Sequence, residues 1–344
     1  MADLPVLARL MIGTEGRHNK GVMSQQQHQA GPPYAPKTAG VGGLPTIIPD
    51  VPISAVFLAL YVAFAAANMT IYQVNGRRGH KFIPSVALFG LCMARITTLV
   101  LRIAWATHQT NIRLSIAANI FVNAGILVVY VLNIIFAQRI LRAKQPRLGW
   151  STALRVIYRI LYVGVAAALI MVITAVTLSV YSLNAYTLQA CRDVQLASGL
   201  YLLVITTLPV FILAAAYLLP RSHAEETFGA GSMKSKALIV LVVSCLCILN
   251  SGFKSGTAWM PPRPSNDPAW YHGKAPFYVF NFTVEIIILC ILTPLRIDKR
   301  FYIPDGSKEP GNYSGGRVGS SDGSVREVTA EKEPRPNDTS STLV

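Results

Sequence analysis

The chain contains 344 residues, of which 52% are hydrophobic and only 14% are charged, and its formal net charge is +15. Soluble domains carry about 25% charged residues, so this composition argues against an ordinary soluble enzyme. Nearly all of the excess basic charge falls within residues 51–295, among long apolar runs. That mixture is typical of a membrane protein, whereas a nucleic-acid-binding protein would gather Lys and Arg on a polar domain.

Residues 1–50 precede the first long apolar run and are rich in Gln, Gly and Pro after residue 13. Such a composition cannot bury enough apolar surface to offset the entropy of ordering, so we expect a largely disordered tail. The one early apolar run, 5–13, is short and interrupted by Arg9, which argues against a secretory signal peptide.

Seven apolar runs follow, each near the length of about 20 residues that crosses a bilayer as a helix. They are residues 51–73, 83–105, 114–136, 160–182, 197–219, 237–253 and 276–295. The links between them are short, which favours one compact bundle with antiparallel neighbours. The sequence therefore predicts an all-α fold with seven transmembrane helices over residues 51–295, followed by a cytosolic and mostly disordered tail, 296–344.

Lys and Arg residues in the short loops predict the orientation of the bundle, because they concentrate on the cytosolic side of a membrane. With the N-terminus outside, fifteen of them lie on the inner side, including the start of the C-terminal tail, and six lie on the outer side. We therefore expect the N-terminus outside and the C-terminus in the cytosol. Both the plasma membrane and an internal membrane fit this orientation.

The first predicted helix carries a stripe of small side chains. Ala55, Ala59, Ala63 and Ala67 follow one another at four-residue spacing, which lets another helix approach closely. Packing against a helix of the same chain is the simpler interpretation, and a homodimer seam is the alternative.

Charged side chains at membrane depth are costly and usually face a partner or a functional cavity. Arg95 and Arg102 lie in the second predicted helix, and Glu285 lies in the seventh. At a rise of about 1.5 Å per residue, Arg95, Glu285 and Asn123 of the third helix lie at similar depths. The sequence therefore predicts a polar site shared by three helices.

Helical spacing assigns further polar residues to this site. The candidate ligand-binding residues are Arg95, Arg102, Asn119, Asn123, Tyr278, Asn281 and Glu285. We expect Arg95 to pair with Glu285, and Arg102 to form an outer layer with Asn119 and Tyr278 that offers positive charge to an anionic or polar ligand. A structural ion pair without any ligand is the alternative.

The predicted inner loop 137–159 is strongly basic and contains Trp150. Cations near a membrane surface gain about 1 kcal/mol each from anionic headgroups. The candidate headgroup-binding residues are Arg139, Arg142, Lys144, Arg147, Arg155 and Arg159. The alternative is that these residues only set the topology.

The predicted outer loop 254–275 is rich in proline and carries Trp259 and Trp270. Because Trp favours the membrane interface, an ordinary aromatic belt is one interpretation. A lid over a cavity that opens outward is the other.

Several residue types are missing from the positions where intramembrane enzymes need them. Cys191 is the one cysteine expected in an outer loop, so no structural disulfide is predicted. All six His residues fall in loops or tails, and no Asp falls in a predicted helix. Intramembrane zinc hydrolases and proteases need such residues at depth, and no phosphate-binding glycine loop is evident. We therefore expect no enzymatic activity, no metal and no cofactor.

Several stretches resemble a fungal family of multi-pass membrane proteins of unknown function. They are GHKFIPS at 79–85, RITTLVLRIAW at 95–105, the region 123–150, KSGTAWMPPR at 254–263 and PAWYHGKAPFYVFNFTVE at 268–285. The resemblance covers residues 50–305 and implies a membrane fold without an assigned activity. A looser resemblance is to the fungal seven-helix lipid-translocating exporters, whose arginine–glutamate pattern in the sixth helix is replaced here by NSGFK at 250–254.

Three functions fit these features. The first is a transporter or lipid-handling protein with an outward-facing polar cavity. The second is a receptor that signals through the basic cytosolic loops. The third is a membrane scaffold in which the buried charges only fix the packing.

Overall fold

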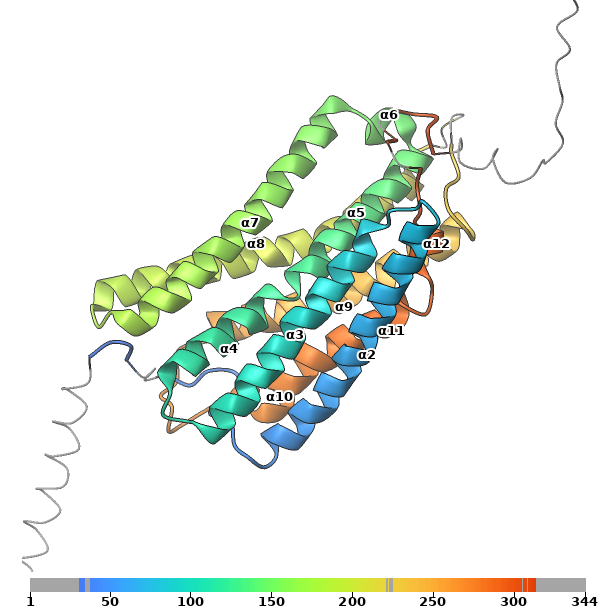
Figure 1. Ribbon diagram of the computed structural model, residues 1–344. Coiled ribbons are helices and arrows are strands. Elements are labelled where there is room, and N and C mark those ends of the chain that lie inside the picture. Colours follow the sequence, from blue (N-terminus) through green and yellow to red (C-terminus); the bar gives the residue numbers. More distant parts are fainter. Residues whose placement is uncertain are drawn as a thin grey trace, which may run out of the picture.

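The computed structural model of the protein describes residues 31–34, 38–220, 222, 225–304, 306–307 and 309–313. Within these residues, seven helical spans are long and apolar enough to cross a membrane. They pack side by side in one elongated bundle (Figure 1). The expected α-helical class and the number of spans are confirmed, and they indicate an integral membrane protein.

Each span has defined bounds. In chain order they are α2 (Asp50–Arg77), α3 (Ile83–Thr107), α4 (Ile112–Ala124) joined to α5 (Leu127–Lys144), α7 (Thr152–Tyr181), α8 (Ala185–Leu218), α9 (Met233–Trp259), and α10 (Lys274–Tyr278) continued by η2 (Val279–Thr283) and α11 (Val284–Leu292). Shorter helices are α6 (Pro146–Gly149), η1 (Trp270–His272) and α12 (Ile297–Arg300).

The two ends of the bundle carry different connections. Residues 38–49 and the links 108–111, 182–184 and 260–273 lie at one end, which we call the amino-terminal end. The links 78–82, 145–151, 219–220 and 225–232 lie with residues 293–304 and 309–313 at the opposite end, which we call the carboxy-terminal end. In Figure 1, α7 and α8 form one side of the bundle, and α2 with the seventh span forms the other.

Short polar residues start four of the helices. Asn111, Ser151, Asn184 and Ser232 each precede α4, α7, α8 or α9, and each side chain accepts a hydrogen bond from a backbone N–H of the first turn. Such caps satisfy donors that have no partner within the helix. The outward faces of the spans carry large exposed apolar side chains, including Ile160, Ile170 and Phe211. An apolar outer surface of this extent fits contact with lipid.

A ladder of polar side chains joins α2 to the seventh span and the segment that follows it. Four residues of α2 at strict seven-residue spacing face inward, and each hydrogen-bonds a residue farther along the chain. The pairs are Ser54 with Tyr278, Tyr61 with Glu285, Asn68 with Thr293, and Asn75 with Asp298. A seven-residue period keeps side chains on one helix face, so the ladder fixes the register of these two segments.

Two spans depart from regular α-helix. The third span is interrupted at Gly125 and Ile126, between α4 and α5. The seventh passes through the π-helical segment η2. Irregular backbone at membrane depth is tolerated where protein groups satisfy its freed carbonyls, and π-helical turns are frequent at functional sites.

Several predicted boundaries were wrong. The third span continues to Lys144 instead of ending at residue 136, because its last turns, including Ile140, are buried in the bundle. Most of the predicted loop 137–159 therefore belongs to α5 and α7. The sixth span likewise continues to Trp259 instead of ending at residue 253, so Lys254 is helical.

The fifth span shows the largest boundary error. It begins at Ala185 instead of residue 197, because the polar residues Gln189, Arg192 and Asp193 lower the hydropathy of its first turns. Cys191 is therefore a buried helical residue and not a loop residue. The expectation that no Asp lies in a helix is also wrong, since Asp193 lies within α8.

Parts of both predicted disordered tails are folded. Thr38 forms an isolated antiparallel bridge with Pro264, and the Gly42 N–H donates to the carbonyl of His272 at 2.9 Å. At the carboxy-terminal end, Phe301 and Tyr313 are buried because their rings pack against other aromatic side chains. Within the two predicted tails, residues 1–30, 35–37, 305, 308 and 314–344 lie outside the described residues.

The alanine stripe of α2 faces outward for most of its length. Ala55, Ala59 and Ala63 are exposed, and Ala67 is half-buried. The inward face of α2 is instead the polar ladder. The expectation that this stripe packs within the chain is therefore wrong for its first three members.

Candidate functional site

A fully buried ion pair joins α3 to the seventh span. The side chains of Arg95 and Glu285 are both 0% exposed. The Nε of Arg95 donates to Glu285 Oε2 at 2.6 Å, and its Nη2 bonds to Oε1. The Tyr61 hydroxyl donates to the same carboxylate at 3.2 Å. The pairing predicted from depth is confirmed, and it includes a tyrosine that the depth argument did not identify.

The same guanidinium also satisfies the break in the third span. Arg95 Nη1 donates to the carbonyls of Phe121 and Val122, at 3.3 and 2.9 Å. Its Cζ lies so close to Gly125 that a Cβ at that position would be 3.1 Å away. The break, its glycine and Arg95 therefore form one structural unit.

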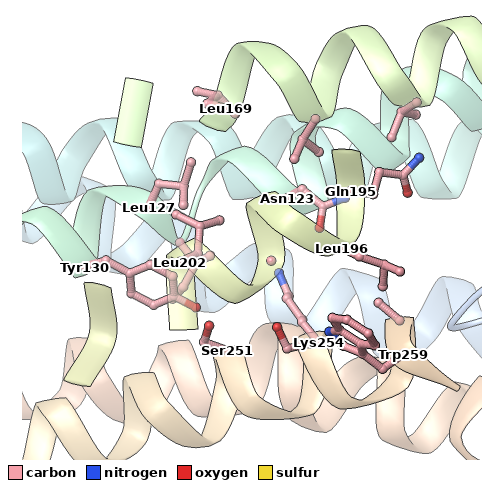
Figure 2. A pocket seen from close by; sticks show the side chains of 16 residues that line it. Asn123, Leu127, Tyr130, Leu169, Gln195, Leu196, Leu202, Ser251, Lys254 and Trp259 are labelled. Carbon is pink, nitrogen blue, oxygen red and sulfur yellow. The ribbon is translucent and has the colours of Figure 1, made fainter. Parts of the chain in front are cut away.

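A cavity of about 150 Å³ lies beside this break and is lined by the third span, α7, α8 and α9 (Figure 2). Its walls are mainly apolar, with Leu127, Leu169 and Val172 among them. The polar groups that line it are Asn123, Tyr130, Gln195, Ser251, Lys254 and Ser255, and Trp259 also lines it. An apolar space with a few convergent polar groups has the character of a ligand site.

Lys254 is the charged residue of this lining. Figure 2 shows its side chain rising from α9 into the cavity, toward Asn123. Its Nζ donates to the Val122 carbonyl at 3.5 Å, the same acceptor that Arg95 uses. Across the described residues, no carboxylate lies within 4.0 Å of this ammonium. The cavity therefore contains a cation whose charge no anion of the described chain compensates.

One face of α9 supplies several of the polar groups. Ser251, Lys254, Ser255 and Ala258 follow the i, i+3, i+4, i+7 spacing of a helix face and all line the cavity. The buried hydroxyl of Ser255 has no hydrogen-bond partner. Hydrogen-bonding capacity and positive charge thus converge on one space.

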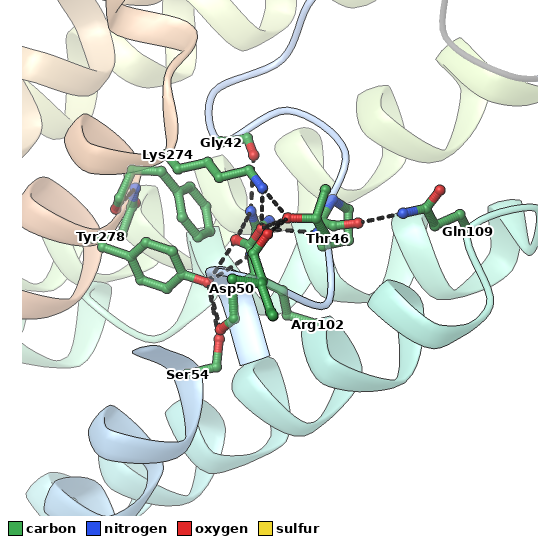
Figure 3. Close-up of polar contacts among 12 residues, drawn as sticks. Gly42, Thr46, Asp50, Ser54, Arg102, Gln109, Lys274 and Tyr278 are labelled. Atoms are coloured by element: carbon green, nitrogen blue, oxygen red, sulfur yellow. Dashed lines mark hydrogen bonds and ion pairs between the residues drawn. The ribbon is translucent and has the colours of Figure 1, made fainter. Parts of the chain in front are cut away.

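A second polar cluster lies at the amino-terminal end, around Asp50 (Figure 3). Its carboxylate is 1% exposed and pairs with Arg102 at 3.0 Å and with Lys274 at 2.6 Å. The Tyr278 hydroxyl donates to it at 2.8 Å, and the Thr46 N–H donates at 2.9 Å. Two cations thus share one carboxylate, which α3, α10 and the segment 38–49 all help to hold.

The N-terminal segment 38–49 closes over this Asp50 cluster. Arg102 Nη2 donates to the Gly42 carbonyl at 2.8 Å, and Gln109 Nε2 donates to the Pro45 carbonyl at 2.8 Å. Gly42 has a φ of +87°, and a Cβ there would lie 2.6 Å from the Phe277 ring. Only glycine fits this close approach, so Gly42 allows the segment to pass directly over the Phe277 ring.

Five of the seven predicted ligand-binding residues lie in three places. Arg95 and Glu285 form the buried pair, and Arg102 and Tyr278 belong to the Asp50 cluster. Asn123 lines the cavity, while its amide donates to the Asn119 carbonyl at 3.0 Å. The structure does not bring Asn119 into the outer layer, because it is exposed and lies off the buried face of α4.

Asn281 occupies the π-helical segment. Its amide nitrogen donates to the Phe277 carbonyl at 3.0 Å, and its buried Oδ1 has no partner. The neighbouring carbonyl of Phe280 accepts a hydrogen bond from Asn250 of α9. The irregular turn is therefore held by side chains on both sides.

The basic residues at the carboxy-terminal end fall into two groups. Arg139 donates to the Phe301 carbonyl, Arg142 lies over the Trp150 ring, and Lys144 pairs with Glu225 at 2.7 Å. These three are engaged within the chain. Arg147, Arg155 and Arg159 are exposed.

Several residues of these sites were not predicted from the sequence, among them Lys254 and Asp50. Lys254 was assigned to an outer loop, and Asp50 was assigned to a disordered tail. Continuing the helical face from Ser251 through Ala258 would have identified Lys254 as a residue facing the bundle. No comparable periodic signal marks Asp50, because Arg102, Lys274 and Tyr278, which bind its carboxylate, are 52 to 228 residues distant.

The described residues contain no group of three or more His, Cys, Asp or Glu side chains that could hold a metal ion. The polar groups of the cavity are instead amides, hydroxyls and one ammonium. Such groups suit an organic ligand that accepts hydrogen bonds.

Comparison with known proteins yields one match. A family model described as "Protein of unknown function (DUF3112)" matches residues 146–235, which run from α6 to the start of α9. No curated protein and no solved structure matches the chain. The family match fits the expected resemblance to a family without an assigned activity.

Proposed function

We propose that this protein is a transport or lipid-handling membrane protein whose ligand occupies the cavity beside Lys254. The observation that carries the proposal is an uncompensated ammonium inside a mainly apolar space. Lys254 is half-buried, and a charge without an ion-pair partner in an apolar space is unfavourable. A position that serves packing alone would therefore favour an apolar residue. A ligand that accepts hydrogen bonds from Lys254 explains its presence.

The other two polar clusters fit a supporting role. The Arg95–Glu285 pair and the Asp50 cluster both join charges of opposite sign within the chain. They hold the third and seventh spans and the N-terminal segment in place. The proposal places the N-terminus outside and the C-terminus in the cytosol, with Arg147, Arg155 and Arg159 contacting anionic headgroups there.

The experiment compares molecules that co-purify with the full-length protein. Val172 lines the cavity, so Val172→Phe fills part of it, whereas Val163 on the same helix is 64% exposed and Val163→Phe is a matched control. Lipid-soluble molecules retained by each variant are measured by mass spectrometry. We expect the wild type and Val163→Phe to retain a species that Val172→Phe loses. The same retained species in all three proteins would contradict the proposal and favour the scaffold or receptor alternatives.

A further inference from the structure

We infer that the cavity binds the headgroup of a single-chain amphiphile that carries one carboxylate, with Lys254 as its ion-pair partner. This inference rests on the proposed function, because it names the ligand class of the same cavity. The charge of the site, its volume and the apolar residues that line it support this inference.

The charge of the site favours a monoanion. Lys254 is the cation that faces the cavity, and Arg95, on the far side of the shared Val122 carbonyl, is already neutralised by Glu285. One uncompensated positive charge matches one negative charge. A carboxylate also accepts several hydrogen bonds at once, and the unpartnered Ser255 hydroxyl and the Gln195 amide line the same space.

The size of the site favours a headgroup over a whole ligand. Pockets that enclose a drug-sized molecule have about 300–1,000 Å³, whereas this cavity has about 150 Å³. A cavity of about that size holds a molecule as small as benzene. A long hydrocarbon chain must therefore leave the cavity.

The walls of the cavity offer the chain an apolar route outward. Leu169, Val172 and Val176 line it from α7, and Leu196 and Leu202 line it from α8. The outward faces of these two helices carry exposed apolar residues such as Ile170 and Leu200. A chain that runs along α7 and α8 therefore keeps its contacts apolar from the headgroup to the surrounding lipid.

The test uses photoreactive probes on the full-length protein in neutral phosphatidylcholine nanodiscs. One probe is a dodecanoate with a diazirine in its chain, and the other is the corresponding dodecanol with the same diazirine. Cross-linked peptides are mapped by mass spectrometry. We expect the carboxylate probe to label segments 169–176 and 195–202 about tenfold more than the alcohol, a difference of about 1.4 kcal/mol. Equal labelling by the two probes would overturn the inference.

Substitutions of Lys254 test the ion pair directly. We expect Lys254→Met and Lys254→Gln to reduce the carboxylate-to-alcohol labelling ratio to about one, whereas Lys254→Arg keeps the preference. An unchanged ratio in correctly folded Lys254→Met and Lys254→Gln would contradict the assignment. If Val172→Phe abolishes labelling by both probes while the Lys254 variants leave the ratio unchanged, the cavity function stands and the carboxylate assignment fails.

A competition arm separates an amphiphile from a small soluble carboxylate. Unlabelled dodecanoate and hexanoate are added at equal concentrations, and both present the same headgroup. We expect dodecanoate to compete with the photoprobe and hexanoate to compete at least about tenfold less, because its short chain gains less from apolar burial. Equal competition would overturn the requirement for a long chain.

Discussion

The Asp50 cluster and the Lys254 cavity both lie toward the amino-terminal end of the bundle, yet they differ in how the charge of their cations is compensated. Asp50 receives two cations, a tyrosine hydroxyl and a backbone N–H. Lys254 has one long hydrogen bond to a carbonyl and faces an open space. The charges of the Asp50 cluster are paired within the chain, so its structural role explains it. The Lys254 ammonium has no ion-pair partner among the described residues and lines a cavity, which indicates a ligand. The predictions below test this division.

The largest expected effect concerns the Arg95–Glu285 pair. Removing one partner leaves a buried charge without compensation, which costs about 3–5 kcal/mol. We therefore expect Arg95→Leu and Glu285→Leu each to lower the free energy of unfolding strongly, and the double variant to recover part of the loss. Thermal unfolding in mild detergent measures this, with Arg113→Leu at an exposed position of α4 as the control. A double variant as unstable as the sum of the two single variants would show that the residues do not act as a pair.

A smaller effect is expected at Asp50. Asp50→Asn leaves Arg102 and Lys274 close together without their shared carboxylate, and hydrogen bonds to charged groups are worth about 1.5–3 kcal/mol. The N-terminal segment should loosen first, because Arg102 also holds the Gly42 carbonyl. Hydrogen–deuterium exchange should therefore accelerate in residues 38–49, while Asp193→Asn, at an exposed position of α8, leaves it unchanged. Unaltered exchange in Asp50→Asn would show that the cluster does not hold this segment.

The break in the third span predicts opposite outcomes for two glycines. Ala normally stabilises a helix by about 0.5–1 kcal/mol relative to Gly, and Gly90 has open space around its missing Cβ. Gly90→Ala should therefore be neutral or stabilising. Gly125→Ala should destabilise by about 1–3 kcal/mol, as overpacking does, because its Cβ would press on Arg95. Equal effects of the two substitutions on the unfolding temperature would contradict the close approach of Arg95 and Gly125.

The smallest effect is expected at Asp298, beyond the last span. Although burial raises its pKa, hydrogen bonds from Arg296 and Asn75 outweigh burial and lower the pKa below the ordinary value of 3.8. These bonds therefore stabilise the fold above the ordinary pKa, and the stabilisation is lost as the pH falls through the lower folded value. Because Arg296 is 43% exposed, we expect less than about 1 kcal/mol.

Hydrogen–deuterium exchange of residues 293–301 at decreasing pH measures this contribution. After correction for the intrinsic pH dependence of exchange, the wild type should lose protection in acid, and Asp298→Asn should lack that loss because it has no proton to bind there. Asp267→Asn, at a side chain that is 73% exposed, is the matched control. The same acid profile in Asp298→Asn and wild type would remove Asp298 as its cause.

Hydropathy and helix geometry predicted much of this architecture and part of the site. The apolar runs identified the seven spans because a helix that crosses a lipid bilayer needs a long apolar stretch. Depth counted along two helices was enough to pair Arg95 with Glu285, since a buried charge needs a partner. The spans and this pair can therefore be predicted from local sequence and the thickness of a membrane.

The remaining features depend on contacts that hydropathy does not encode. Lys254 was missed because the polar residues Asn250 and Ser251 lower the hydropathy at the end of the apolar run, although they face the bundle interior. The break at Gly125 was missed because a single glycine in an apolar run does not interrupt its hydropathy. Asp50 was missed because its ion pairs depend on how the N-terminal segment folds back over α3 and α10.

The central claim is that Lys254 pairs with a carboxylate inside the cavity. Solid-state NMR measures this pairing directly, through the dipolar coupling between carboxyl-¹³C dodecanoate and ¹⁵N-lysine side chains of the protein in nanodiscs. We predict a coupling that places the carboxylate within ion-pair distance of a lysine Nζ, about 4 Å, and that is present in the wild type and absent in Lys254→Met. No coupling in the wild type, or the same coupling in Lys254→Met, would contradict the claim.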